Sequence, residues 1–265
     1  MNRHRPRKRF GQHFLHDAAV IARIVRAIDA KPGDRVVEIG PGLGALTGAL
    51  LHSCDSLDVI ELDRDLAAAL QSEYADEGRL RVHTGDALDF DFHQLVSPGE
   101  QLRVVGNLPY NVSTPLLFHL LRQGPIVADM HFMLQREVVD RLIAEPGGRD
   151  YGRLTVMVQL RCECEKLFNV GPGAFRPPPR VTSAIVRLRV RPRLGARLSD
   201  LPTFERLVSH LFSQRRKTLR KSLRGQLGEA EIAALGIDPG ARPETLDLAR
   251  FAALANAVHG GKDDD

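Results

Sequence analysis

The stretch VVEIGPGLGALTGAL, residues 36–50, decides the fold of this 265-residue chain. It begins with a β-branched run typical of a buried strand and ends with a pattern typical of a helix. Between the two, Gly40, Gly42 and Gly44 form a turn that lets backbone N–H groups and the start of a helix approach a ligand closely. Because Ala45 also completes the spacing G-x-G-x-x-G/A, binding of NAD or FAD has to be considered at this point.

Short apolar runs recur along the chain, separated by segments with helical periodicity. The first is preceded by a predicted helix over residues 17–30, for which Asp17 is the expected N-cap. Alternation of strand and helix is the signature of a parallel α/β sheet. The predicted strands cover residues 35–40, 57–62, 80–86, 102–107, 128–135, 162–170 and 183–190, of which the last is expected to close the sheet.

The C-terminal part of the sequence differs in character from the rest. A polar connection with Pro and Gly, residues 191–202, leads into an apolar helical stripe that includes Phe204, Leu207 and Leu211 and is surrounded by Arg and Lys. We therefore expect a sheet domain with a basic N-terminal arm over residues 1–198 and a small all-helical domain over residues 199–265.

Composition excludes several classes of protein. Hydrophobic residues make up 43% and charged residues 26% of the chain, and no apolar run approaches the roughly 18 residues that span a bilayer. The basic N-terminus has no apolar segment after it, so it does not predict a secretory signal. Cys54, Cys162 and Cys164 form no CxxC pair, which argues against a disulfide framework and a metal site. We expect a cytoplasmic protein without metal or membrane contact.

Basic residues are concentrated in two segments of this chain, whose net charge is +4. They are MNRHRPRKRF (1–10) and SQRRKTLRKSLR (213–224), whereas the stretch 55–91 is rich in Asp and Glu. Such a distribution indicates a polyanion held at the edges of a site, although charge for solubility alone is the alternative. The candidate RNA-binding residues are Arg215, Arg216, Lys217, Arg220 and Lys221.

Polar side chains stand at the ends of three consecutive predicted strands: Glu61, Asp86 and Asn107. In an open parallel sheet, ligands bind at the carboxyl ends of the strands. A carboxylate at position 61 suits the two hydroxyls of a ribose, and one at position 86 suits an exocyclic amine such as that of adenine. Together with the glycine turn, this set fits a nucleoside without a pyrophosphate better than it fits NAD. Taken alone, Glu61 or Asp86 fits a helix N-cap equally well.

The segment VVGNLPYN, residues 104–111, has the composition of a turn that offers hydrogen-bond acceptors. Pro109 lacks an N–H and biases Leu108 towards an extended conformation, so the Asn107 side-chain oxygen and the Leu108 carbonyl remain as acceptors. Two acceptors on the hydrogens of an aromatic amine draw its nitrogen towards a tetrahedral geometry and free the lone pair for attack. Tyr110 can stack on the base. A purely structural turn is the alternative.

A second aromatic candidate is Phe175, in the loop GPGAFRPPPRVTSA at residues 171–184. Three consecutive prolines at residues 177–179 stiffen this loop. If the loop lies over the strand ends, a flipped base fits between Tyr110 and Phe175. A proline-rich connector with one buried Phe explains the same residues.

Nine segments, in order along the chain, resemble the ribosomal RNA adenine N6-dimethyltransferases. They are RKRFGQHFL, VVEIGPGLGALT, VIELDRD, GDAL, GNLPYNVSTPLL, FMLQREVVDRL, YGRLTVMVQ, FRPPPRVTSAIVRL and SQRRKTLRKSL. They are spread along the sequence, so that the resemblance extends over nearly the whole chain. The resemblance implies an α/β class I S-adenosylmethionine-dependent methyltransferase (Rossmann-like) sheet with a small all-helical C-terminal domain. It also implies S-adenosyl-L-methionine as the methyl donor and no metal.

The resemblance assigns roles to individual positions. The implied donor-binding residues are His13, Leu15, Gly40, Glu61, Asp86 and Asn107, and the implied catalytic residues are Asn107, Leu108, Pro109, Tyr110 and Phe175. Position 13 is commonly Asn in the family, so with His13 a backbone contact to the donor is better supported than a side-chain contact.

The most similar members imply dimethylation of the N6 amino groups of two adjacent adenosines in a 3′-terminal hairpin of 16S rRNA, by a monomer acting on the assembling small ribosomal subunit. The implied reaction is a direct in-line transfer, repeated on the same nitrogen. Two alternatives stay open: a 23S rRNA adenine N6-methyltransferase that confers antibiotic resistance, and a non-catalytic RNA-binding assembly factor. The segments FGQHFL and RRKTLRKSL favour the 16S enzyme, and intact Glu61, Asp86 and Asn107 favour catalysis.

Overall fold

The computed structural model describes residues 12–261 of the chain. The basic N-terminal arm and the last four residues of the chain lie outside this range. Within it, no helix is long and apolar enough to cross a membrane.

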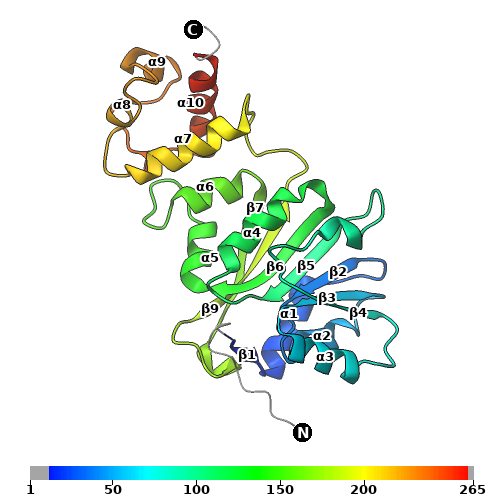
Figure 1. The fold of residues 1–265 in the computed structure, drawn as a ribbon. Helices are drawn as coiled ribbons and strands as arrows, with labels where there is room; N and C mark the ends of the chain where they lie inside the picture. The colour runs from blue at the N-terminus through cyan, green and yellow to red at the C-terminus, as the bar shows by residue number, and fades with distance from the viewer. Residues whose placement is uncertain (1–11, 262–265) are drawn as a thin grey trace. The chain divides into compact units, whose positions relative to one another are not determined.

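The centre of the fold is a sheet to which residues 12–261 contribute seven strands (Figure 1). The order of the strands across the sheet is β4 (Leu80–Thr84), β3 (Leu57–Glu61), β2 (Arg35–Ile39), β5 (Leu102–Asn107), β6 (Val127–Gln135), β9 (Ser183–Val190) and β7 (Cys162–Val170). Pairing is parallel from β4 to β6, whereas β9 runs antiparallel to β6. The expected α/β sheet is confirmed, but the prediction that residues 183–190 close it is wrong, because β7 is the edge strand beside β9.

The strand order places the glycine turn at the point where the chain changes direction across the sheet. From β2 the chain moves outward to β3 and β4, and it then returns to β5 on the other side of β2. Parallel pairing brings the ends of these four strands to one edge of the sheet, which is where open α/β sheets bind ligands.

Helices connect the strands of the sheet. The predicted first helix is confirmed, and Asp17 caps it by accepting hydrogen bonds from the backbone N–H groups of Ala19 and Val20. In Figure 1, the helix α4 (Ser113–Arg122) crosses in front of β6 and packs against it. The helical segments of this region are α1 (Ala18–Ile28), α2 (Ala45–Leu50), α3 (Arg64–Glu73), η2 (Phe92–Leu95), α4 (Ser113–Arg122), η3 (Gly124–Ile126), α5 (Arg136–Leu142) and η4 (Pro172–Ala174).

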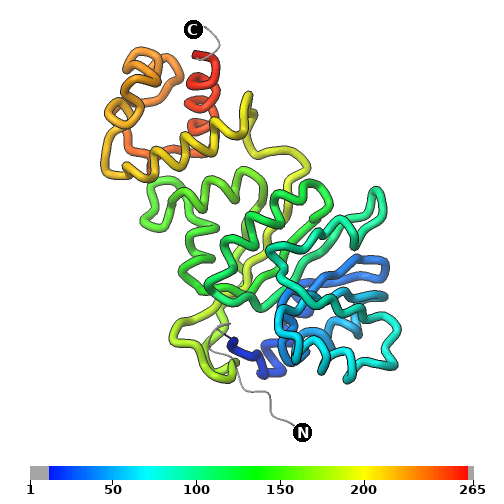
Figure 2. Tube along the Cα trace, in the orientation of Figure 1, coloured from blue at the N-terminus to red at the C-terminus, as the bar shows by residue number. Residues whose placement is uncertain are grey.

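A second, two-stranded sheet joins segments that are far apart in the sequence. The strand β1 (Phe14–Leu15) pairs antiparallel with β8 (Phe175–Arg176), so that Leu15 lies opposite Phe175. Figure 2 shows the dark-blue start of the described chain beside the yellow-green segment around residue 175. Two residues are too few for a periodic pattern, which is why the sequence did not predict these strands.

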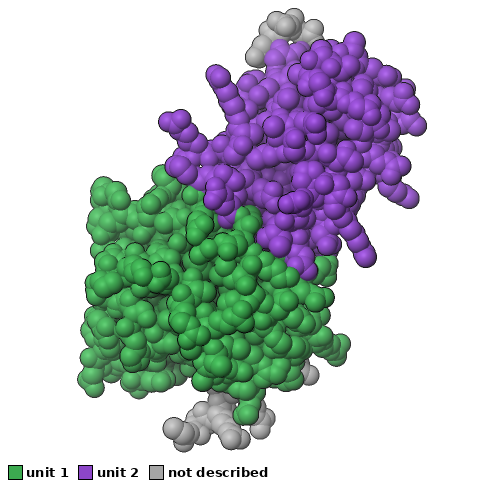
Figure 3. All heavy atoms as spheres, turned by 180° about the vertical axis from the view of Figure 1, so that it is seen from behind, with its two compact units in different colours: residues 1–139, 164–190 green, residues 140–163, 191–265 purple. Residues whose placement is uncertain are grey.

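The remaining helices form a separate compact unit, coloured purple in Figure 3. The first unit holds the residues up to Val139 and Cys164–Val190, and the second holds Asp140–Glu163 and the residues from Arg191 onward. In the second unit lie α6 (Arg153–Gln159), α7 (Leu201–Ser213), α8 (Leu219–Ser222), α9 (Glu229–Ala234), η5 (Pro243–Thr245) and α10 (Leu248–Gly260).

This division differs from the expected boundary between residues 198 and 199, because residues 140–163 group with the C-terminal helices. The Tyr151 hydroxyl donates to the Leu246 carbonyl at 2.8 Å, and its ring meets that of Phe212 edge-on. The Gly147 N–H donates to the Glu244 carbonyl at 2.6 Å. These partners follow at least 61 residues later in the sequence, so local periodicity carries no sign of them.

Candidate active site

A cavity of about 260 Å³ opens at the ends of β2, β3, β4 and β5, within the first unit. Most of the residues expected at the site line it. These are His13, Leu15, Gly40, Glu61, Asp86, Asn107, Leu108, Pro109 and Tyr110. Phe175 is absent from the lining, whereas Phe14, Glu38 and Asp63 belong to it although the sequence did not single them out.

The glycine turn between β2 and α2 has a backbone that favours glycine. Gly40, Gly42 and Gly44 have φ angles of +67°, +59° and +75°. A Cβ on Gly42 would lie 3.1 Å from the Phe14 ring, and one on Gly44 would lie 2.9 Å from Leu70 Cδ2. A Cβ on Gly40 would meet no described atom within 4 Å. The turn thus packs closely on the protein at Gly42 and Gly44 and is open at Gly40.

Glu61 is a buried carboxylate at the end of β3, held by the backbone on both of its oxygens. Oε2 accepts from the Gly42 N–H at 3.0 Å and Oε1 accepts from the Asp63 N–H at 2.8 Å. Burial raises the pKa of this carboxyl, and the two backbone hydrogen bonds oppose the rise. Glu61 is not the N-cap of α3, because Asp63 has that role. Each carboxylate oxygen keeps a free lone pair, so the two oxygens together suit the two hydroxyls of a diol.

Glu38 is a second buried carboxyl in the cavity wall, only 1% exposed. It accepts a hydrogen bond from the Thr47 hydroxyl at 2.6 Å. Burial raises its pKa to about 7, the Thr47 hydrogen bond opposes the rise, and the charge of Glu61 adds to it. A charged residue inside the apolar run VVEIG was the sequence signal that could have identified it.

Asp86 follows β4 and turns the chain, since its Oδ1 accepts from the Leu88 N–H at 2.9 Å. Its Oδ2 has no hydrogen bond among residues 12–261. The side chain therefore combines a local turn with a remaining acceptor at the cavity.

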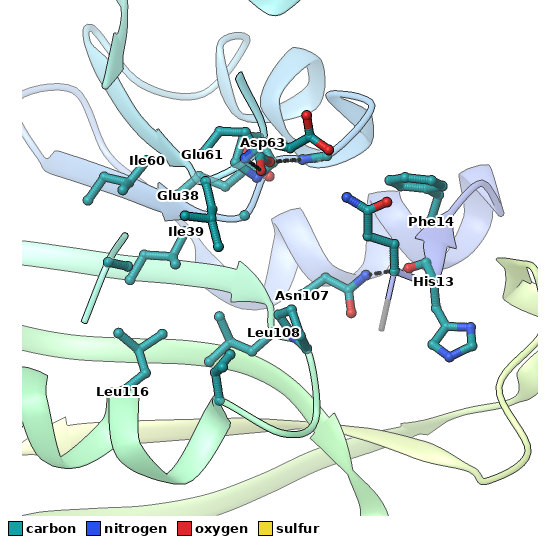
Figure 4. A pocket seen from close by; sticks show the side chains of 18 of the residues that line it. His13, Phe14, Glu38, Ile39, Ile60, Glu61, Asp63, Asn107, Leu108 and Leu116 are labelled. Atoms are coloured by element: carbon teal, nitrogen blue, oxygen red, sulfur yellow. Dashed lines mark hydrogen bonds between the residues drawn. The ribbon is translucent and has the colours of Figure 1, made fainter. Parts of the chain in front are cut away.

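Asn107 ends β5 and has a defined amide orientation, as Figure 4 shows. Its side-chain nitrogen donates to the backbone carbonyl of His13 at 2.9 Å. A carbonyl only accepts, so the NH₂ group must face His13 and Oδ1 must be the other end of the amide. Within residues 12–261, Oδ1 has no donor. Asn107 thus keeps the acceptor that was predicted for it.

The turn that follows has the expected acceptor pattern. The Leu108 N–H donates to the Met133 carbonyl at 3.3 Å, and the Val112 N–H closes the turn on the Pro109 carbonyl at 3.2 Å. No donor among the described residues reaches the Leu108 carbonyl. The Asn107 Oδ1 and the Leu108 carbonyl therefore stand next to each other in the chain as unused acceptors.

Tyr110 lies at the cavity, but its ring does not face Phe175. Phe175 is 2% exposed and packs in the core with residues such as Leu15, Val105 and Met133. The Tyr110 ring lies beside the His13 ring, with centroids 6.1 Å apart and an angle of 29° between the planes. Phe175 is thus buried in the core, as the alternative of a proline-rich connector with one buried Phe predicts. The structure does not bring the rings of Tyr110 and Phe175 together.

His13 contacts its surroundings through both its main chain and its side chain. Its carbonyl accepts from Asn107, and its Nδ1 donates to the Pro177 carbonyl at 2.7 Å. In Figure 4 the ring points away from Asn107. The side chain is therefore engaged with the proline-rich loop.

The five basic residues expected to bind RNA lie in the second unit and have unequal surroundings. Arg215 donates to the Arg149 carbonyl at 3.1 Å and stands 3.7 Å from a Glu244 carboxylate oxygen, so it has protein partners. Arg220 lies 3.8 Å from Glu229 in an exposed pair. The side chains of Arg216, Lys217 and Lys221 have no hydrogen bond or ion pair within the described part of the chain.

The chain matches known proteins over almost its full length. The sequence model of the family described as "Ribosomal RNA adenine dimethylase" matches residues 3–259. Two curated relatives are named ribosomal RNA small subunit methyltransferase A. The one from Pseudomonas aeruginosa is 60% identical over 257 residues, covering 96% of this chain and 95% of its own. The one from Nitrosococcus oceani is 61% identical over 252 residues, covering 95% of each.

Solved structures agree in fold. A dimethyladenosine transferase from Plasmodium falciparum superposes with a TM-score of 0.75 at 27% identity, covering 91% of this chain and 96% of its own. The 23S rRNA methyltransferase ErmE superposes with a TM-score of 0.74 at 27% identity, covering 93% of this chain and 99% of its own. The expected methyltransferase fold and the resemblance read from the nine segments are confirmed. The chain belongs to the ribosomal RNA adenine dimethylase family.

Proposed function

We propose that this enzyme transfers methyl groups from S-adenosyl-L-methionine to the N6 amino groups of two adjacent adenosines in a 3′-terminal hairpin of 16S rRNA. Family membership makes it an rRNA adenine dimethyltransferase. The observation that carries the proposal is the orientation of Asn107, which leaves its amide oxygen as an unused acceptor next in the chain to the unused Leu108 carbonyl, and both residues line the cavity. The enzyme acts as a monomer in the cytoplasm, where small subunits are assembled.

The residues around the cavity fit the methyl donor. Glu61 offers one acceptor position on each carboxylate oxygen to the ribose hydroxyls, and Asp86 Oδ2 offers one to the adenine amine. Gly40 leaves open space where another residue would have a side chain. The donor supplies a methyl group on a positively charged sulfur, which is the electrophile of the reaction.

The reaction follows from the acceptors of the turn. Hydrogen bonds from the target amine to Asn107 Oδ1 and to the Leu108 carbonyl draw the nitrogen lone pair out of conjugation with the ring. The lone pair then attacks the methyl carbon in line with the bond to sulfur. Positioning and oriented dipoles supply the rate enhancement. The nitrogen loses its proton to water once it carries four bonds, so no strong base is required.

RNA binding involves the second unit. The side chains of Arg216, Lys217 and Lys221 have no hydrogen bond or ion pair within residues 12–261 and suit the phosphates of the rRNA backbone. Recognition of the partly assembled subunit gives the enzyme a role in small-subunit biogenesis.

The 23S alternative is not favoured, because the curated relatives at 60% and 61% identity are named for the small subunit. ErmE shares the fold at only 27% identity. A non-catalytic RNA-binding factor would need neither the two acceptors at Asn107 and Leu108 nor a Glu61 carboxylate held by the backbone. The presence of both features therefore argues against this alternative.

The test is to incubate the protein with labelled S-adenosylmethionine and either unmethylated small subunits or large subunits, and then to map the modified nucleotides. We expect two dimethylated adjacent adenosines in the small-subunit rRNA and no label in the large subunit. Label confined to 23S rRNA would establish the resistance alternative, and absence of S-adenosylmethionine binding in calorimetry would establish the non-catalytic one. The Asn107→Ala variant is the control for transfer that depends on the site.

A further inference from the structure

The Tyr110 side chain is anchored by a residue that lies 73 positions later in the chain. The phenol oxygen of Tyr110 and the hydroxyl oxygen of Ser183 are 2.8 Å apart. At this distance the two hydroxyls form a hydrogen bond, in which either group can donate. Two segments that are separated in the sequence by several helices and strands are thus joined at the active site.

Ser183 is fixed more firmly than Tyr110. It is 1% exposed and is the first residue of β9, where it lies opposite Gln135 in the antiparallel ladder with β6. Immediately before it, the Thr182 carbonyl accepts from the Arg136 N–H at 3.0 Å. The Ser183 hydroxyl is therefore held at a set position relative to the sheet whose strand ends form the cavity.

The main chain of Tyr110 is held as well. The Ser113 hydroxyl donates to the Tyr110 carbonyl at 3.1 Å, and Pro109 and Val112 close the turn around it. A tyrosine ring rotates about two bonds. Fixing the backbone and the phenol oxygen fixes the first rotation, and therefore the direction in which the side chain points, whereas the phenol oxygen lies on the axis of the second rotation. The His13 ring alongside it, 6.1 Å away and inclined by 29°, occupies one of the directions in which it could otherwise turn.

We infer that Ser183 is a positioning residue for methyl transfer: it fixes the direction of the Tyr110 side chain, and therefore the place of the ring on which the target base stacks. This inference rests on the proposed function, because it takes Tyr110 as the face for the adenine. Ser183 itself needs no contact with the RNA or with the methyl donor. Its effect is to remove the need to order the Tyr110 ring when the base arrives.

A double-mutant cycle tests the inference. The kcat and KM of methyl transfer to unmethylated small subunits are measured for wild type, Ser183→Ala, Tyr110→Phe and the double variant. Tyr110→Phe keeps the ring and removes only the hydroxyl. We expect kcat/KM to fall about two- to tenfold in each single variant, because one side chain, that of residue 110, must then be ordered when the RNA binds. The double variant should lose no more than either single one.

Two further measurements separate positioning from a general structural defect. Calorimetry should give the same Kd for S-adenosylmethionine in all four proteins, and Ser183→Thr, which keeps a hydroxyl on a strand residue, should recover the wild-type kcat/KM. Additive losses in the cycle, or unchanged kcat/KM in Ser183→Ala, would overturn the inference. An inactive wild-type protein would instead count against the proposed function, so the two failures are distinct.

Discussion

The side-chain amide of Asn107 donates to the main-chain carbonyl of His13 at 2.9 Å, which links the end of the central strand β5 to the segment just before β1. Because the partner is a carbonyl, this bond also decides which end of the amide is left for a substrate. The acceptor required for amine activation is thus oriented before any ligand arrives, and no ordering of the side chain is needed at the moment of reaction.

Replacing Asn107 by Ala should reduce methyl transfer by at least about 10²-fold, because it removes a preorganised partner of the reacting nitrogen. RNA binding should stay close to wild type, since the basic residues lie in the other unit. Single-turnover methylation and filter binding measure the two effects. His13→Ala is the comparison, because its bond to Asn107 is made by the main chain and survives the change, so its loss should be smaller. Near-normal turnover of Asn107→Ala would refute the acceptor mechanism.

Glu38 should make stability depend on pH in a defined window. The carboxyl has a pKa of about 7 in the folded protein, against an ordinary value of 4.5. Between these values the folded state retains a proton that the unfolded state has lost, so stability falls as pH rises from about 4.5 to 7 and then levels off. The difference in free energy of unfolding between wild type and Glu38→Gln should therefore change by on the order of 3 kcal/mol across this window.

Urea unfolding of both proteins at pH 5 and pH 8 measures this difference. Gln keeps an acceptor for the Thr47 hydroxyl and carries no charge at either pH, so it is the matched control for Glu38. A difference in stability that stays constant between the two pH values would mean that Glu38 ionises normally in the folded state.

Gly106 should be essential for the position of Asn107. A Cβ at this residue would lie 2.6 Å from the Ile39 carbonyl oxygen on the neighbouring strand β2, and backbone cannot move aside as a side chain can. We expect Gly106→Ala to lower the free energy of unfolding by about 3 kcal/mol and to impair transfer. Gly171→Ala is the matched control, because its φ is −73° and its Cβ would meet no described atom within 4 Å. Equal stability of the two variants in thermal unfolding would show that the strands separate easily.

Neutralising Arg216 and Lys217 together should weaken RNA binding and make it less sensitive to salt. If each contacts one phosphate, the slope of log K against log salt should fall by about two. Binding is measured over a salt series, with Arg26→Gln/Arg122→Gln as the charge-matched control on the first unit. The same slope in wild type and in Arg216→Gln/Lys217→Gln would assign the basic cluster to solubility. Arg215→Gln should affect stability as well, because Arg215 has protein partners.

The elements with long periodic patterns could be predicted from the sequence. The strands up to residue 135 and the helix capped by Asp17 each carry their signal within about ten residues, and local spacing sets the face they bury. The strands β1 and β8 are two residues long and depend on each other, so they have no such signal. At the other end of the chain, Asp247 caps α10, and residues 243–245 before it form a short 3₁₀ turn.

The sequence by itself determined the chemistry that is available: the glycine turn, Glu61, Asp86 and the acceptors of residues 107–110 all stand at strand ends, where a parallel sheet must collect them. Tertiary structure alone decided how those groups are held. The bonds of Asn107 to His13 and of Tyr110 to Ser183 join residues 94 and 73 positions apart, and core packing takes Phe175 away from the cavity. Contacts over such distances depend on how the whole chain packs, and short-range patterns contain no information about them.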